Sequence, residues 1–344
     1  MGDAMTSLQR LQDLQQGPGK DLLDATQAIG FSAEVARAGL EAEFSAWNEG
    51  DTLDAMRARV AKLESEIRPK SVLVIAAGTL PASTLRHVLF ARLLGAQVFL
   101  KCATGQEAIG EAIQAADPGV LATPFSREDS HALRSTIDQV DTVVALGSDT
   151  SLDDIKGHVP FHKTFVGYGH RVSAAWCDDP SPAELEGLAD DLLMWDQAGC
   201  ISPHILWTRT DPVQVAKDLA KQVAIKEKNL PMTLGPWAAR ERHVASVFGQ
   251  MTGHAVATET AVIAALSTAT FRPSPRHRFL WVLPASQAAL EEILPKLSTL
   301  AVSGSPGVAL PGHVRRCALG QMQRPPLHWA QDGDDPLLAL LRAS

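Results

Sequence analysis

The spacing of hydrophobic residues changes character near residue 70. Before that point Ala, Leu, Glu and Arg recur at helical spacing and β-branched residues are few, so residues 1–68 are predicted to be helical. One stretch of this region places on a single helical face the residues Leu53, Met56, Val60 and Leu63. Pro69 ends the helical region because proline cannot continue a helix.

Beyond Pro69, short apolar runs rich in β-branched residues alternate with helical stretches. Strands are predicted at 71–76, 97–101, 142–146, 164–166, 204–207 and 279–283. Helices are predicted from the loop at 77–81 through Leu94, and then at 105–116, 127–139, 183–195, 211–228, 287–300 and 336–342. Apolar strands that alternate with helices predict an α/β fold with a doubly wound, parallel sheet.

Composition and charge narrow the functional class. A chain of 344 residues can form two domains or one large α/β unit, and its 45% hydrophobic content is too high for a disordered chain. The net charge of -8 argues against a nucleic-acid partner. The polar N-terminus lacks the apolar core of a secretory signal, and no apolar run is long enough to span a membrane. We therefore expect a cytoplasmic enzyme without a membrane span.

The cysteines and histidines give little support for a disulfide or a metal site. The cysteines form no CxxC pair, which is typical of a reduced compartment; they are Cys102, Cys177, Cys200 and Cys317. His158 and His162 have the spacing of a zinc-ligand pair, but Pro160 forbids a helix between them and no second pair follows. A loop with two histidines and no metal is expected. GxSxG and the phosphate loop GxxxxGK[ST] are absent, which removes common hydrolase and NTPase functions.

Two glycine-containing segments follow predicted strands. Gly167-Tyr-Gly169 looks glycine-rich, but Val172 fills the third glycine position of GxGxxG, so a tight turn after the strand is the simpler interpretation. Gly147-Ser148 lies between a strand and a helix, where backbone amides suit a phosphate or a ribose. Taken alone, it is equally an ordinary turn with helix-capping residues.

Cys200 is the candidate nucleophile. It follows a glycine at the junction between a long helix and a strand, in Asp196-Gln-Ala-Gly-Cys-Ile-Ser-Pro-His204. A cysteine at such a junction can be exposed and nucleophilic if its thiolate is stabilised, although a buried structural cysteine is the common alternative. Cys102 and Cys317 fit that alternative, and Cys177 precedes two aspartates that would not stabilise a thiolate.

Taken in order, these segments resemble the aldehyde dehydrogenase superfamily and, within it, the acyl-CoA reductases of the bioluminescence fatty-acid reductase type. The resemblance runs from Ser71 to Gly333 and is strongest in two segments. The first is Phe-Val-Gly-Tyr-Gly-His-Arg-Val-Ser at 165–173, and the second is the Cys200 segment, where those reductases carry a DQQGC-x-SP pattern. The resemblance implies a homo-oligomer whose chains have two doubly wound domains, mostly parallel sheets and an active-site cleft between the domains. It divides the chain into a cofactor domain at 1–196, a catalytic domain at 197–310 and a returning tail at 311–344.

The resemblance also implies roles for individual residues. Cys200 would attack an acyl thioester, Thr79 would help its backbone N–H to stabilise the oxyanion, and His170 or His204 would protonate the departing thiol or tune the thiolate. Lys101 would bind the adenosine ribose or a 2′-phosphate, which favours NADPH. The same cofactor would contact loop and helix-start residues at Gly78, Gly147, Ser148, Gly167 and Gly169.

Departures from the superfamily pattern shape the expected activity. No carboxylate occurs in 166–170, where aldehyde dehydrogenases carry the glutamate that activates water, and this suits release of the acyl group to a thiol or as an aldehyde. Thr79 replaces an asparagine, no Glu-x-Phe-Gly-Pro segment is present, and the chain is short. We expect NADPH-dependent reduction of a long-chain acyl-CoA or acyl-protein thioester to a fatty aldehyde, with a synthetase as a further partner. The alternatives are another oxidoreductase of the superfamily and a catalytically impaired scaffold subunit.

Overall fold

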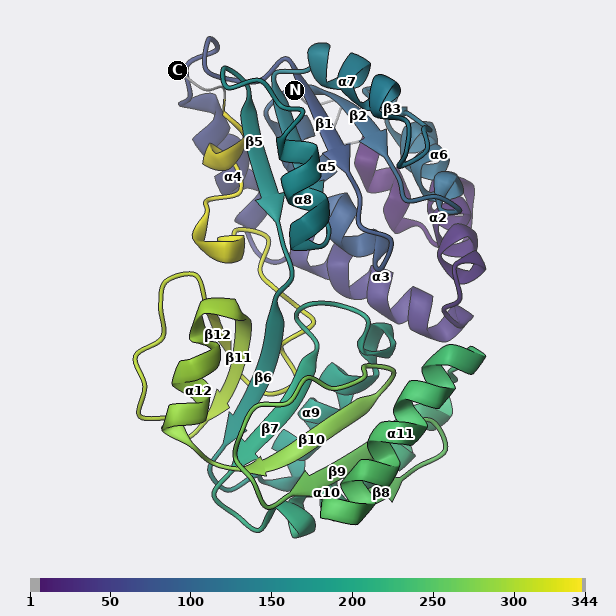
Figure 1. The fold of residues 1–344 in the computed structure, drawn as a ribbon. Coiled ribbons are helices and arrows are strands. Elements are labelled where there is room, and N and C mark those ends of the chain that lie inside the picture. The colour runs from purple at the N-terminus through teal and green to yellow at the C-terminus, as the bar shows by residue number, and fades with distance from the viewer. Residues whose placement is uncertain (1–6, 342–344) are drawn as a thin grey trace. The chain divides into compact units, whose positions relative to one another are not determined.

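The computed structural model describes residues 7–341 (Figure 1). Two compact units make up the chain. Unit 1 combines Met1–His170 with Pro326–Ser344, and unit 2 is Arg171–Pro325. The first six residues of the predicted N-terminal helical region lie outside the described residues. No helix in the described part of the chain is long and apolar enough to cross a bilayer.

Unit 1 is built on a five-stranded parallel sheet with the strand order β3-β2-β1-β4-β5. The strands are β1 (Ser71–Ile75), β2 (Gln97–Lys101), β3 (Val120–Ala122), β4 (Thr142–Leu146) and β5 (Thr164–Tyr168). The sheet is covered on both faces (Figure 1) by the helices α5 (Pro81–Leu93), α6 (Glu107–Ala116), α7 (Ser130–Asp138) and α8 (Asp149–Lys156). Burial on both faces explains why the inner strands are almost continuously apolar.

The N-terminal helical prediction is confirmed in the described residues as far as Ala61, whereas residues 62–68 form turns and are not helical. The region contains the short 3-10 helix η1 (Arg10–Gln12) and the α-helices α2 (Gly17–Ala28), α3 (Ala33–Trp47) and α4 (Thr52–Ala61). Of the predicted apolar face, Leu53, Met56 and Val60 are buried on α4, whereas Leu63 lies beyond the end of that helix. Helix α2 packs against α6 and thereby joins this region to the sheet.

Unit 2 is built on a seven-stranded sheet with the strand order β12-β11-β6-β7-β10-β9-β8. Only the pair β8–β9 among its described strands is antiparallel. The strands are β6 (Val172–Cys177), β7 (Pro203–Thr208), β8 (Gly253–Ala257), β9 (Val262–Leu266), β10 (Phe279–Pro284), β11 (Leu297–Ser303) and β12 (Arg315–Cys317). The mostly parallel, doubly wound α/β prediction is therefore confirmed.

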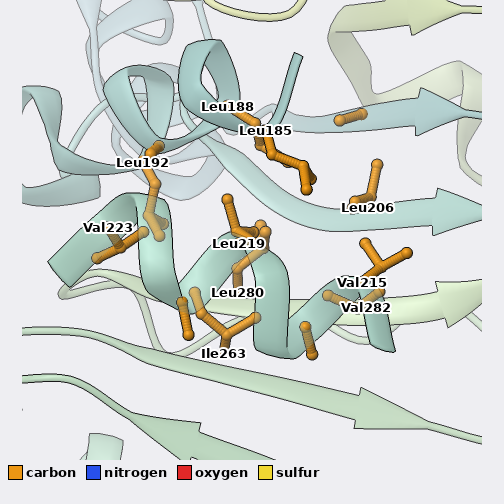
Figure 2. Close-up of a cluster of buried hydrophobic side chains, with 14 of the residues drawn as sticks. Leu185, Leu188, Leu192, Leu206, Val215, Leu219, Val223, Ile263, Leu280 and Val282 are labelled. Atoms are coloured by element: carbon orange, nitrogen blue, oxygen red, sulfur yellow. The ribbon is translucent and has the colours of Figure 1, made fainter. Parts of the chain in front are cut away.

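Two apolar layers cover the sheet of unit 2. On one face, α9 (Pro182–Leu193) and α10 (Pro212–Lys226) pack a leucine- and valine-rich cluster against the strands, as Figure 2 shows. On the other face, α11 (Pro236–Thr252) and α12 (Gln287–Ile293) cover a second cluster that contains three buried tryptophans, Trp176, Trp207 and Trp281. The centre of the sheet is thus dry on both sides, which gives a rigid base for the loops at its strand ends.

Two helix predictions are wrong at the C-terminal end. The helix expected at 287–300 ends at Ile293, and β11 occupies the rest of that stretch after a short 3-10 turn that contains Pro295. The helix expected at 336–342 is a single 3-10 turn at Leu338–Leu340 within the described residues. In the first case Pro295 contributes no helical hydrogen bond, and pairing with β6 and β12 satisfies the backbone instead.

The unit boundary differs from the expected domain boundary after residue 196. Unit 2 begins at Arg171, because β6 pairs with β7 and β11 and α9 packs on the same sheet. The expected return segment at 311–344 also divides. Its first part carries β12 and stays with unit 2, and only the part from Pro326 joins unit 1.

Candidate functional site

The predicted cofactor residues meet at one edge of the unit 1 sheet. In a parallel sheet every strand ends at the same edge, and ligands bind there, where the strand order reverses. That reversal lies between β1 and β4. The residues that follow or end the strands at this edge are Gly78 and Thr79 after β1, Lys101 on β2, Gly147 and Ser148 after β4, and Gly167 and Gly169 at the end of β5.

Lys101 is a buried cation on β2. Its side chain is only 8% exposed, and its ammonium lies 5.7 Å from the centroid of the Phe125 ring. Among the described residues it makes no hydrogen bond or ion pair, and its charge interacts with the exposed carboxylate of Glu107. A buried ammonium normally requires hydrogen-bond partners, so this position suits the hydroxyl or phosphate oxygens of a ligand.

The start of α8 presents both backbone amides and a carboxylate. Ser148 is the N-cap, and its Oγ accepts a hydrogen bond from the Ser151 N–H at 3.2 Å. The neighbouring Asp149 accepts a hydrogen bond from the His170 N–H at 3.0 Å. A Cβ on Gly169 would lie 2.5 Å from the Asp149 carboxylate, so a larger residue there would require that side chain to move. The helix end can therefore receive a ligand, although the charge of Asp149 opposes a phosphate close to it.

The loop after β1 is open to solvent. Gly78 and Thr79 are exposed, and the Gly78 carbonyl accepts a hydrogen bond from Gln106 Nε2 at 2.8 Å. A Cβ on Gly78 would lie 3.2 Å from Ala103 Cβ, which leaves little space there for a larger residue. The loop is thus held by Gln106, while the exposed side chain of Thr79 is accessible to a ligand.

Cys200 lies in a constrained turn of unit 2, between α9 and β7. The turn is closed by the Ser202 N–H, which donates to the Gly199 carbonyl at 3.2 Å. The carbonyl of Cys200 itself accepts a hydrogen bond from Ser173 Oγ on β6 at 2.8 Å. The three residues Trp195, Asp196 and Gln197 before the turn all have left-handed backbone angles, with φ of 54°, 51° and 63°. The peptide of the candidate nucleophile is therefore held by the sheet.

A second strained turn contacts the residues around Cys200. Arg276, His277 and Arg278 also have positive φ values of 65°, 57° and 60°. Arg278 forms a buried ion pair with Asp196, from Nη2 to Oδ1 at 2.6 Å. Burial raises the pKa of Asp196, and the Arg278 guanidinium opposes that shift.

His204 lies four residues after Cys200 and is buried at the start of β7. Its Nδ1 accepts a hydrogen bond from the Ser274 N–H at 3.1 Å, and Ser274 Oγ lies at the same distance. Because Nδ1 is the acceptor, the proton of the neutral ring sits on Nε2. The other candidate histidine, His170, and the candidate Thr79 belong to unit 1.

The family model described as acyl-CoA reductase (LuxC) matches residues 117–343, which include Cys200 and its turn. The chain belongs to the acyl-CoA reductase (LuxC) family. No curated protein sequence matches it significantly.

Solved structures place this acyl-CoA reductase family member in the aldehyde dehydrogenase fold. NADP-dependent glyceraldehyde-3-phosphate dehydrogenase from Bacillus halodurans C-125, complexed with NADP, has a TM-score of 0.66 at 13% identity, over 98% of this chain and 83% of that one. Aldehyde dehydrogenase 21 from Physcomitrella patens has a TM-score of 0.66 at 13% identity, over 97% of this chain and 77% of that one. NAD-dependent aldehyde dehydrogenase from Sinorhizobium meliloti has a TM-score of 0.64 at 13% identity, over 91% of this chain and 73% of that one. Family and fold together make the protein an oxidoreductase that acts on aldehyde or acyl groups.

The other cysteines of this family member are poor nucleophiles. Burial raises the pKa of Cys102, Cys177 and Cys317 to about 11 in each case. A thiol with such a pKa is almost fully protonated at neutral pH, and the protonated form is a weak nucleophile. This chemistry agrees with the prediction of Cys102 and Cys317 as structural cysteines and of Cys177 as a thiol without thiolate stabilisation, which leaves Cys200 as the candidate.

Residues 7–341 contain no His, Cys, Asp and Glu cluster that could hold a metal ion. His158, one of the two loop histidines, accepts a hydrogen bond at Nδ1 from Arg134 Nε at 3.1 Å.

Four residues around Cys200 have no role in the sequence prediction, namely Ser173, Gln197, Ser274 and Arg278. Gln197 lies in the Cys200 segment and Ser173 ends the 165–173 segment, but neither was given a role there, and Ser173, Ser274 and Arg278 are joined to the Cys200 segment through contacts that are distant in sequence.

Proposed function

We propose that this family member reduces a long-chain acyl thioester, carried on coenzyme A or on a protein, to a fatty aldehyde with NADPH. Cys200 supports the proposal most directly, because it lies in a sheet-anchored turn while burial keeps the other three thiols protonated. The family name supports the same chemistry.

In the proposed mechanism the thiolate of Cys200 attacks the carbonyl carbon of the substrate thioester. The backbone N–H of Cys200 would donate to the developing oxyanion, a contribution of about 3 kcal/mol for a good donor. The bond from carbon to the departing sulfur then breaks, and the sulfur leaves as a thiolate that takes a proton, for which His204 of the same unit is the candidate donor. Cys200 now carries the acyl group as a thioester.

NADPH, when bound, supplies the hydride that reduces this thioester to an aldehyde and returns Cys200 to the thiolate. Lys101 would hold the ribose or 2′-phosphate, and the other contacts would come from Gly78, Gly147, Ser148, Gly167 and Gly169. The residues fit such a ligand because the buried ammonium of Lys101 makes no hydrogen bond within the described residues. Residues 166–170 contain no carboxylate to activate water, so the acyl group is kept for reduction.

Further parts of the proposal concern assembly and supply. We propose a homo-oligomer in the cytoplasm, with a synthetase that delivers the acyl group. The alternatives are another oxidoreductase of the superfamily and a scaffold subunit, and the following experiment tests the proposal against them.

The test is the intact mass of the protein after incubation with a long-chain acyl-CoA, before and after addition of NADPH or NADH. The wild type and the matched control Cys317→Ala should each gain one acyl group, which NADPH clears with formation of aldehyde. Cys200→Ala should gain none. An adduct that neither cofactor clears would contradict the reductase function, and the absence of any adduct would favour the scaffold role.

A further inference from the structure

We infer that the turn at 274–279 positions Cys200, with Arg278 and Ser274 as positioning residues that act through Asp196 and His204. The inference rests on the proposed role of Cys200 and adds residues that the motif does not contain. It follows from three separate connections between the segment 196–204, which carries the thiol, and this one turn.

The first connection is the ion pair before the thiol. Asp196 Oδ1 accepts from Arg278 Nε at 2.9 Å and from Nη2 at 2.6 Å. Arg278 is 0% exposed, and its Nη1 donates to the Leu230 carbonyl at 2.8 Å and to Thr260 Oγ1 at 2.7 Å. The planar guanidinium therefore bridges three segments at fixed angles, which a lysine ammonium cannot reproduce.

In the second connection, the side-chain amide of Gln197 pairs with the backbone of Phe279 as a neighbouring strand would. The Phe279 N–H donates to Gln197 Oε1 at 2.8 Å, and Gln197 Nε2 donates to the Phe279 carbonyl at 2.7 Å. The same Nε2 donates to the Pro203 carbonyl at 2.6 Å and contacts Ser274 Oγ at 3.2 Å. Gln197 thus ties the residue before the turn to the residue after it and fixes both to the 274–279 turn.

The third connection lies after the thiol. His204 Nδ1 receives the Ser274 N–H and lies 3.1 Å from Ser274 Oγ. Residues on both sides of Cys200 are consequently bonded to the same short turn, and Cys200 is the member of the segment between them. Residues 195–197 and 276–278 are all left-handed, which costs of order 1 kcal/mol per residue and persists only when the surroundings fix the backbone.

A positioning role makes a prediction that a purely structural role does not. Reaction requires the sulfur to approach the carbonyl carbon within a narrow geometry, and a displacement of about 1 Å can cost about 100-fold in rate. Loosening the 274–279 turn should therefore lower kcat and the chemical reactivity of Cys200, with little change in KM and no general unfolding.

The experiment compares Arg278→Lys with the matched control Arg315→Lys, since Arg315 is also buried in unit 2 but donates to the Met322 carbonyl instead. Iodoacetamide labelling is followed at Cys200 by peptide mass, and buried Cys177 in the same molecules reports unfolding. We expect Arg278→Lys to slow Cys200 labelling and kcat by about 10- to 100-fold, with KM and Cys177 protection unchanged. Arg315→Lys should match the wild type.

Wild-type labelling and kcat in a folded Arg278→Lys protein would overturn the inference. If that variant exposes Cys177, the smaller changes Ser274→Ala and Ser274→Thr decide instead. The alanine should slow Cys200 labelling and the threonine, which keeps the hydroxyl, should restore it, whereas equal labelling of both would again overturn the inference. Labelling needs no turnover, so a failure of the acyl-adduct experiment would reject the proposed function without deciding the positioning role.

Discussion

His87 carries an ionisable ring in the apolar interior of unit 1. It lies on α5 and stacks on Tyr168 with ring centroids 4.5 Å apart. It is buried, and its Nε2 has no hydrogen-bond partner within the described residues. Burial, with a smaller effect from the Arg86 charge, lowers its pKa from 6.5 to about 3. The His87 ring is therefore neutral in the folded protein at ordinary pH.

This pKa shift predicts acid sensitivity. Between pH 3 and 6.5 the unfolded chain binds a proton at His87 and the folded chain does not, so stability rises with pH in this window and is lost as pH falls below 6.5. At pH 5 the loss is about 2 kcal/mol relative to neutral pH. His87→Leu should remove that part of the pH dependence, as measured by urea unfolding at pH 7.5 and pH 5.

The comparison uses the difference between the two pH values, so any change in packing cancels. His131→Leu replaces an exposed histidine on α7 and should keep the wild-type pH dependence. If His87→Leu loses as much stability on acidification as the wild type, the acid sensitivity does not arise from His87.

At the level of elements, most predicted strands were continuous apolar runs, although the similar run of β9, Val262–Leu266, was not predicted. Residues 71–76 and 142–146 are such runs, and they form β1 and β4. β11 was mistaken for helix because its leucines continue a helical spacing with the preceding ones, at Leu290, Leu294, Leu297 and Leu300. A strand buried on both faces accepts the same residues, so the pattern alone could not separate the two states.

The candidate site divides in the same way. Cys200 and its neighbours were identified because their pattern is contiguous, and the cofactor residues because each follows a strand. Arg278 lies 82 positions from Asp196, and its partner could be found only from the fold. Ser173 ends the 165–173 segment but has no sign there of its contact with Cys200, and Ser274 has no local signal, because a serine in a loop is common. The local pattern therefore gave the candidate residues, and their tertiary contacts came only from the fold.

One pair of elements approaches so closely that a single methyl group should separate them. A Cβ on Gly187 of α9 would lie 2.8 Å from the Leu319 carbonyl oxygen and 3.1 Å from Gly320 Cα. Gly187→Ala would gain about 1 kcal/mol of helix propensity, but the clash is with backbone and costs about 1–3 kcal/mol. We expect net destabilisation, measured as a lower midpoint of thermal unfolding.

The control for this prediction is Gly312→Ala, since nothing lies within 4 Å of a Cβ at that position in the same tail. Gly312→Ala should leave the midpoint within a degree or so of the wild type. A stabilised Gly187→Ala protein would mean that the tail moves away from α9 at no cost and that helix propensity dominates.

For the whole molecule, the important feature is that unit 1 is assembled from two distant parts of the chain. The tail after Pro326 buries Leu337 and Leu340 in unit 1. Two sheet threonines donate to its carbonyls, Thr142 to Leu340 at 2.9 Å and Thr164 to Leu341 at 2.7 Å. Thr142 and Thr164 are the first residues of β4 and β5, so the strands whose opposite ends carry the proposed cofactor residues depend on a segment that follows unit 2 in the sequence.

Loss of this tail contact should weaken unit 1 and spare unit 2. Leu340→Ala removes a buried side chain, which costs about 2–5 kcal/mol, whereas the control Leu338→Ala removes one that is 51% exposed. Hydrogen exchange followed by mass spectrometry should show faster exchange in β4 and β5 and unchanged exchange in β6 and β7. Equal loss of protection in both units would mean that they unfold as one cooperative body, and no loss in either would mean that the tail contributes little to unit 1.

Because Gly147, Ser148, Gly167 and Gly169 follow or end β4 and β5, Leu340→Ala should also weaken binding of NADPH, while Cys200, in unit 2, keeps its wild-type rate of labelling.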